Sequence, residues 1–197
     1  MAAISAKDVQ NLRKICGAPM MDCKKALEES KGDVDKAVEI LRKKGAATAA
    51  KRAEREAKEG IIASYIHGNK IGVLVEVNSE TDFVARSGDF QNFARDVAMH
   101  VAAANPEYLL PEDVPAKVLE KEKEIELEKL KKDGKPANIL DKIWEGKKEK
   151  FFSENCLMKQ AFVKNPDLTI EELLAETIGK IGEKIEIRRF CRFEVGK

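Results

Sequence analysis

Apolar and polar residues alternate in three stretches of the chain, and each stretch predicts a β-strand. Residues 71–78 carry Ile or Val at every odd position, a period of two that is typical of a half-buried strand. A candidate strand over 60–67 precedes it across Gly68-Asn69, a short link that can adopt positive φ and favours a hairpin. Residues 184–195 alternate again. Because a lone hairpin is only marginally stable, we expect this third strand to complete an antiparallel sheet.

The apolar residues of these strands point to both faces of the predicted sheet. In the first strand Ile61, Ala63 and Tyr65 share one face, whereas Ile62 and Ile66 lie on the other. Helices of the same chain can cover one face, and in so small a domain a second copy would cover the other. We therefore predict a homodimer formed through the sheet. The third strand places these apolar residues on one face, with Arg189 interrupting them: Ile185, Ile187, Cys191, Phe193 and Val195.

Three short helices are predicted for the first 46 residues. Apolar positions at helical spacing run over residues 6–15, 20–29 and 34–43, and Gly or Pro stands at each break, the last being Gly45. A module of this size buries little apolar area and should be only marginally stable. Residues 47–59 mix Ala, Lys, Arg and Glu without an apolar stripe, which predicts an exposed helical linker. Its basic residues could contact RNA, but the interleaved glutamates favour a solvated helix.

The remaining residues, 60–197, combine the sheet with further helices in a core domain. Helices are expected over 89–104, 116–132, 137–159 and 169–181. The second and third of these are highly charged and can pair as a projecting hairpin over about 116–160. The fold class is therefore α+β: a three-helix module, a linker helix, and a three-stranded antiparallel sheet with helices.

Charge and composition argue against several classes of function. The 197 residues include 36 basic and 35 acidic side chains, for a net charge of +1, which disfavours nucleic acid as the main partner because phosphate binding needs a basic face. No apolar run is long enough to span a membrane, and the N-terminus lacks a signal-peptide core, so we expect a cytoplasmic protein. The four cysteines form no C-x-x-C pair and the two histidines lie in no catalytic motif, so neither a zinc site nor a cofactor is indicated.

The strongest candidate site follows the second predicted strand and reads Ser-Glu-Thr-Asp-Phe-Val-Ala-Arg over residues 79–86. Its Ser and Thr favour a turn and a helix cap, and the turn places a carboxylate, Asp82, beside a large ring, Phe83. The ring either packs inward onto Phe90, which the pattern alone favours, or serves as a wedge for a partner. An enzyme with Asp82 or Glu80 as general base is a further alternative, but no convergent set of polar residues supports it.

Two segments resemble signatures of the elongation factor Ts family, the guanine-nucleotide exchange factors for elongation factor Tu. Residues 12–27 read Leu-Arg-Lys-Ile-Cys-Gly-Ala-Pro-Met-Met-Asp-Cys-Lys-Lys-Ala-Leu, and residues 81–86 read Thr-Asp-Phe-Val-Ala-Arg. The likeness spans nearly the whole chain, whose length resembles the short bacterial form that dimerises. Three residues differ from those usual in the family: Pro19 replaces Gly, Ser79 replaces Cys and Ala161 replaces Pro. Only Pro19 bears on local geometry, since it can stiffen the approach to the second helix.

The resemblance implies a function and a set of contact residues. The first 46 residues would form a UBA-like module whose Arg13, Met20 and Met21 contact the nucleotide-binding domain of elongation factor Tu. The turn from Thr81 to Val84 would enter that domain near its magnesium and phosphate sites, with Asp82 and Phe83 at its tip, and promote release of GDP so that GTP can bind. No covalent chemistry would be involved. A UBA-type adaptor without exchange activity is the alternative, and the second signature disfavours it.

Cys191 is a candidate dimer-interface residue. In a sheet-to-sheet dimer it could lie near the symmetry axis and face its counterpart, because a residue close to such an axis meets itself. A free thiol is the expected state in a reducing cytosol. A disulfide between two copies is a hypothesis.

Overall fold

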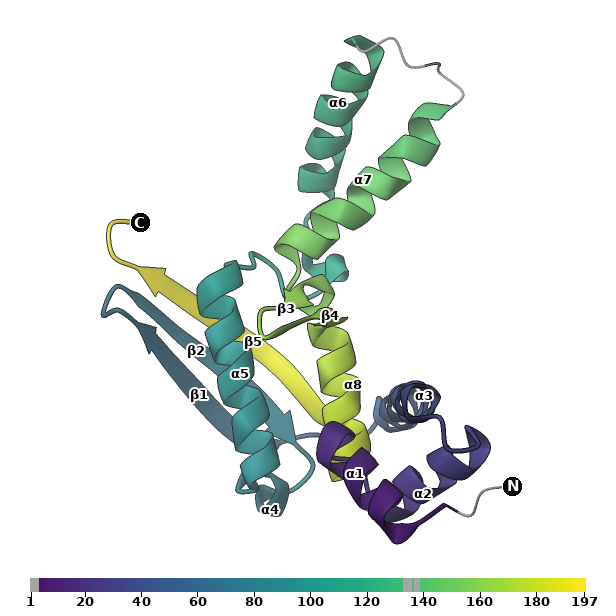
Figure 1. Cartoon of the computed structure of the whole chain (residues 1–197). Helices are drawn as coiled ribbons and strands as arrows, with labels where there is room; N and C mark the ends of the chain where they lie inside the picture. The colour runs from purple at the N-terminus through teal and green to yellow at the C-terminus, as the bar shows by residue number, and fades with distance from the viewer. Residues whose placement is uncertain (1–3, 133–135, 137–138) are drawn as a thin grey trace.

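The computed structural model describes residues 4–132, 136 and 139–197, and it confirms the predicted α+β class (Figure 1). The helices are α1 (Ala6–Cys16), α2 (Met20–Glu29), α3 (Val34–Arg52), α4 (Asp82–Ala85), α5 (Gly88–Ala104), η1 (Pro111–Asp113), α6 (Ala116–Lys132), α7 (Leu140–Asn155), η3 (Leu157–Lys159) and α8 (Ile170–Ile181). The strands are β1 (Glu59–His67), β2 (Ile71–Ser79), β3 (Ala161–Phe162), β4 (Asn165–Thr169) and β5 (Ile185–Glu194). The main sheet is antiparallel in the order β1-β2-β5, and β3 pairs with β4 in a separate small hairpin that the sequence did not predict.

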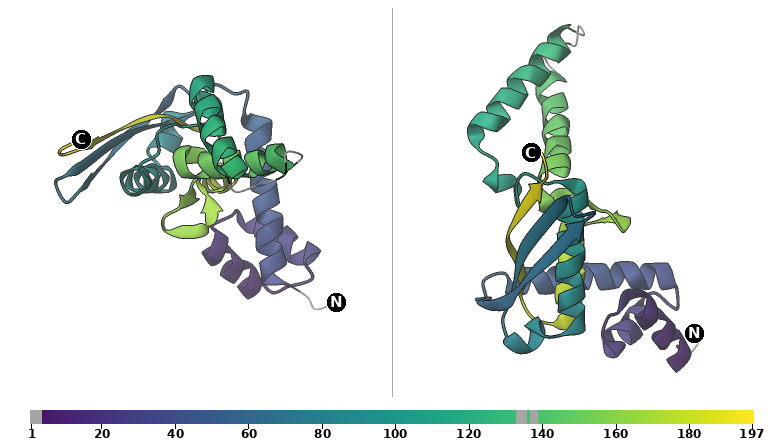
Figure 2. Two further views of the ribbon diagram at one scale, coloured as in Figure 1. Left: turned by 90° about the horizontal axis from the view of Figure 1, so that it is seen from above. Right: turned by 90° about the vertical axis from the view of Figure 1, so that its left-hand side faces the viewer.

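One face of the main sheet packs against α5 and α8 and forms the core (Figures 1 and 2). The three valines at odd positions of β2, Val73, Val75 and Val77, are buried there, as their alternation predicts. The turn between β1 and β2 contains Gly68 at φ 55° and Asn69 at φ 57°. These two left-handed residues confirm the predicted hairpin.

Helix α3 runs straight through Gly45, and this corrects the sequence prediction. Residues 46–52 are the last turns of α3 rather than a separate linker helix, and residues 53–58 are not helical. The reason is a close helix crossing: a Cβ added at Gly179 of α8 would lie only 2.9 Å from Gly45 Cα. Gly45 therefore permits α3 to approach α8, and it does not end the helix. The division of the chain at residues 46 and 60 stays a prediction.

A β-bulge in β5 corrects the prediction that one apolar face runs along the whole strand. Ile187 pairs with Val77, whereas Arg189 pairs with the preceding residue of β2, so Arg188 is an extra residue. A single inserted residue moves every later side chain to the other face. Ile185 and Ile187, before the bulge, are therefore buried, whereas three residues after it are exposed: Cys191, Phe193 and Val195.

Helices α6 and α7 form the predicted hairpin and project from the body (Figures 1 and 2). Val114, Phe152 and Cys156 are buried together at its base. Lys147 on α7 pairs with Glu126 on α6 at 3.2 Å. Residues 137–138, which the sequence assigned to the second helix, lie outside the described residues.

His100 joins α5 to the β3–β4 hairpin and is fully buried. The Val163 amide donates to its Nδ1 at 3.3 Å, so Nε2 carries the proton and donates to Gln160 Oε1 at 2.9 Å. Burial lowers the pKa of the His100 ring, and the Gln160 bond opposes this only in part. Because Nδ1 accepts the Val163 amide, the ring in this arrangement is a neutral structural group.

Candidate functional site

The segment after β2 forms the four-residue helix α4, and Phe83 on it points into solvent. Thr81 is the N-cap, and its Oγ1 accepts a bond from the Val84 amide at 3.3 Å. Val84 and Ala85 are buried, whereas the Phe83 side chain is 82% exposed. The inward packing of Phe83 onto Phe90, which the pattern alone favoured, is therefore wrong. In so short a helix only one side can face the core, and the two smaller residues occupy it.

Asp82 lies beside Phe83 and is exposed as well. Its carboxylate accepts a bond from the Arg86 guanidinium at 2.6 Å, one helical turn away. The two side chains are 61% and 80% exposed, and ion pairs of this kind contribute only about 0–1 kcal/mol. Asp82 can therefore exchange Arg86 for donors on another molecule at little cost.

Two carboxylates behind α4 connect it to the rest of the fold. Glu183, in the turn between α8 and β5, accepts the Thr81 amide at 3.1 Å and the Thr81 hydroxyl at 2.9 Å. Glu80 accepts Arg52 at 2.9 Å, Arg55 at 3.0 Å and the Lys184 amide at 2.6 Å. Burial alone would raise the pKa of Glu80, but these donors more than offset it and hold the pKa below its ordinary value.

The sequence did not reveal this network. Arg52 and Arg55 were interpreted as residues of a solvated helix, yet the Arg52 side chain is only 24% exposed and contacts Glu80. The sequence suggests only a general base for Glu80, and nothing in its pattern singles out Glu183. The partners are 25 to 104 residues apart along the chain, and no periodic pattern links residues at such separations.

The N-terminal module carries a second exposed surface. Arg13 and Met20 line one shallow hollow of about 340 Å³ on α1 and α2, and Met21 beside them is 60% exposed. Ile15 is 65% exposed on the same module, although its place in the helical pattern gave no sign of this. The structure thus brings Arg13 and Met20 together at one hollow, and Met21 is an exposed neighbour of Met20 on α2.

This second surface and α4 lie at the same end of the molecule, away from the tip of the α6–α7 hairpin (Figures 1 and 2). Helix α8 connects them. Lys180 pairs with Asp89 at the start of α5 at 2.6 Å, and a Cβ added at Gly17, which ends α1, would lie 3.0 Å from Lys180 Cε. The module is therefore packed against the core beside α4.

The open face of the sheet is a third exposed apolar surface. Four of its large side chains are between 47% and 71% exposed: Ile62, Ile66, Leu74 and Phe193. The Cys191 thiol is free and exposed, and its residue pairs with Leu74 on β2. Apolar side chains gathered on one exposed face are typical of interaction surfaces.

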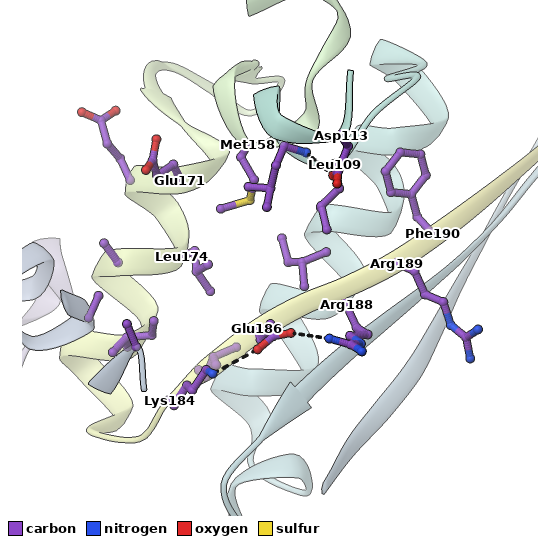
Figure 3. Close-up of a pocket in the computed structure, with 18 of the residues that line it drawn as sticks. Leu109, Asp113, Met158, Glu171, Leu174, Lys184, Glu186, Arg188, Arg189 and Phe190 are labelled. Atoms are coloured by element: carbon purple, nitrogen blue, oxygen red, sulfur yellow. Dashed lines mark hydrogen bonds and ion pairs between the residues drawn. The ribbon is translucent and has the colours of Figure 1, made fainter. Parts of the chain in front are cut away.

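A cavity of about 1050 Å³ lies between α3, α8 and β5 (Figure 3). Its walls are mostly apolar, and Glu186 on β5 pairs there with Lys184 at 3.1 Å and with Arg188 at 3.3 Å. None of the site residues predicted from the sequence lines it. In the part of the chain that the structure describes, no group of three His, Cys, Asp or Glu side chains is placed to hold a metal ion.

Exposed apolar side chains stand on helices of the module, on α4 and on the open face of the sheet, an arrangement typical of proteins that contact other macromolecules. Comparison with known proteins identifies the family. The family model described as "Elongation factor TS" matches residues 2–197, so the chain belongs to the elongation factor Ts family of translation elongation factors. Among the helices described, none combines the length and the apolar character needed to cross a membrane.

Curated relatives named elongation factor Ts match over almost the whole chain. The protein of Carboxydothermus hydrogenoformans is 58% identical over 195 residues, covering 98% of this chain and 90% of the relative. That of Geobacter sulfurreducens is 58% identical over 196 residues, with 99% and 91% covered. That of Desulfosudis oleivorans is 56% identical over 198 residues and is covered completely, as is this chain.

Proposed function

We propose that the protein binds elongation factor Tu and promotes the release of GDP by inserting Asp82 and Phe83 near the magnesium and phosphate sites of that partner. The observation that carries this proposal is the 82% exposure of Phe83 on a short, capped helix. Leaving a phenylalanine ring in water forgoes about 1.5–3 kcal/mol of burial. Such an exposed ring on an anchored helix is suited to insertion into another protein.

The two residues have complementary roles in this proposal. A ring is large, stiff and apolar, so Phe83 can separate packed helices of the partner. Asp82 can accept bonds from donors that otherwise order the partner's magnesium site, once it leaves Arg86. Weaker magnesium and phosphate contacts release GDP without any covalent step.

The module supplies affinity in the same complex. Arg13, Met20 and Met21 would rest on the nucleotide-binding domain, where pliable methionines can follow its surface. By linkage, a factor that weakens GDP binding is itself bound more weakly when GDP is present, by the same ratio. The concentrations of GTP and GDP in the cytoplasm, where we place the protein, would therefore set the direction of exchange.

We also infer that the protein forms a homodimer through the open face of its sheet. The apolar side chains of β1, β2 and β5 on that face support this inference, and α5 and α8 already cover the opposite face. The proposal assigns no direct nucleic-acid or membrane contact to the protein.

The decisive test is stopped-flow measurement of fluorescent GDP release from elongation factor Tu. Wild-type protein should accelerate release, and Phe83→Ala and Asp82→Ala should blunt the acceleration while circular dichroism shows an intact fold. Ile125→Ala is the control, because Ile125 is an exposed apolar residue of α6 in the projecting hairpin, outside α4, the module surface and the open face of the sheet, and we expect it to retain the acceleration.

The alternatives give different results in this assay. Absence of acceleration by the wild-type protein would favour an adaptor without exchange activity. Equal acceleration by all variants would retain the exchange function but move the site away from α4.

A further inference from the structure

The turn that leads into α4 and the turn that leads into β5 bind each other reciprocally. The carboxylate of Glu183 accepts the backbone amide of Thr81 at 3.1 Å, and the carboxylate of Glu80 accepts the backbone amide of Lys184 at 2.6 Å. Each residue pair, 80–81 and 183–184, thus supplies one carboxylate and one amide. The two pairs are more than 100 residues apart in the sequence, so this clasp is a product of the tertiary fold alone.

Within the clasp, Glu183 controls the geometry of Thr81. Its two oxygens lie 2.9 and 3.1 Å from the Thr81 hydroxyl. A hydroxyl has one proton and two lone pairs, so Thr81 donates to Glu183 and still accepts the Val84 amide. The Thr81 carbonyl in turn accepts the hydroxyl of buried Ser79 at 2.9 Å. The amide, hydroxyl and carbonyl of Thr81 therefore all have hydrogen-bond partners that fix their directions.

Helix α4 depends on such anchors because it is only four residues long. A single helical turn fixes several dihedral angles for very few hydrogen bonds and is unstable by itself. Phe83 would gain by folding back onto nearby apolar surface, since water disfavours an exposed ring. The fixed N-cap opposes that collapse.

We propose that Glu183 is a positioning residue for nucleotide exchange, acting through Thr81 to hold Phe83 in its exposed, insertion-ready orientation. This inference rests on the proposed role of Phe83. Glu80 acts alongside it by tying the same turn to Arg52 at the end of α3. Since α3 begins in the N-terminal module, these bonds also hold α4 at a fixed position relative to the module surface.

The test compares Glu183→Ala and Glu183→Gln with wild type in GDP release from elongation factor Tu, over a range of factor concentrations. Glutamine keeps one acceptor oxygen for the Thr81 amide, so it should recover much of the activity. The control is Glu145→Ala, because Glu145 is an exposed residue of the hairpin, far from α4, whose carboxylate pairs with Lys148 at 3.9 Å.

For Glu183→Ala we expect a drop of roughly tenfold in the maximal rate of GDP release, the factor that corresponds to loss of one hydrogen bond to a charged group. The factor concentration at half-maximal rate should change less than about threefold, because the module surface still supplies the affinity. A merely structural role would lower the amount of active protein and leave the rate at saturation unchanged.

Amide hydrogen exchange provides an independent measurement on the factor by itself. In Glu183→Ala the amides of Thr81 and Val84 should exchange faster, while the amides of β2 keep their protection. Unchanged exchange at Thr81 and Val84, or an unchanged maximal rate beside an active wild type, would overturn the proposal. Failure of the wild-type protein to accelerate release would instead overturn the proposed function, and hydrogen exchange would still decide whether Glu183 anchors the turn.

Discussion

The crossing of α3 and α8 at Gly45 and Gly179 yields a prediction whose sign comes from the structure. Replacing Gly179 by Ala places a Cβ 2.9 Å from Gly45 Cα. Carbon atoms in contact prefer about 3.5–4.0 Å, so the helices must separate by roughly 0.6–1 Å. The obstacle is backbone, which cannot rotate away as a long side chain would.

Two opposing contributions set the change in the free energy of unfolding for Gly179→Ala. Alanine improves helix propensity by about 1 kcal/mol over glycine, whereas an overpacked contact costs about 1–3 kcal/mol. The crossing also carries the Arg42–Glu176 pair at 3.1 Å, which separation of the helices would lengthen. We therefore expect Gly179→Ala to lower the free energy of unfolding by about 1 kcal/mol, within a range of roughly 0–2 kcal/mol.

Urea denaturation followed by helical circular dichroism measures this change. Gly146→Ala is the matched control, because Gly146 also lies inside a helix, α7, and a Cβ there meets nothing within 4 Å. It should stabilise α7 by up to about 1 kcal/mol. If Gly179→Ala proved as stabilising as Gly146→Ala, the close crossing would be refuted.

Three further predictions concern single residues. Because burial depresses the pKa of His100 below 6.5, its neutral form stabilises the fold above that pH, and the urea midpoint should fall as the pH drops from 7 to 5; a ring that titrates at or above pH 6.5 by NMR would contradict this. Phe83→Ala should change the free energy of unfolding by less than about 0.5 kcal/mol because the ring is exposed, whereas Phe90→Ala should lower it by about 3–5 kcal/mol. If urea denaturation gave a comparable loss for Phe83→Ala, Phe83 would pack in the core. If the sheet-to-sheet dimer places Cys191 near its axis, mild oxidation should give a covalent dimer on non-reducing gels that Cys191→Ser abolishes; no shift in migration for the wild type would reject the disulfide.

Local patterns in the sequence were sufficient for most of the secondary structure. The alternation in β2, the Gly68-Asn69 turn and the spacing of apolar residues in α5 each depend on residues a few positions apart. The two family-like segments likewise indicated the candidate contact residues, Asp82 and Phe83 in one and Arg13, Met20 and Met21 in the other, because each segment is contiguous. These features are recorded in neighbouring residues and can be recognised without a fold.

Only the tertiary structure decided the features that join distant residues. The direction in which Phe83 points depends on which residues of α4 meet the core, and the sequence pattern favoured the wrong side. The sequence pattern predicted that a helix ends at Gly45, whereas the structure shows that this glycine permits the close approach of α3 to Gly179 of α8. The bulge at Arg188 reversed the faces of β5, since one inserted residue changes the parity of every later position.

The hydrogen bonds that join Glu80 and Thr81 to Glu183 and Lys184 also depend on the tertiary structure. They connect turns that are more than 100 residues apart in the sequence, and any charged residue at a turn is equally compatible with solvent. Sequence by itself determined most of the helices and strands and where the candidate contact residues lie along the chain. The packing of those elements determined how that chemistry is oriented, because orientation is set by contacts that close only when the chain has folded.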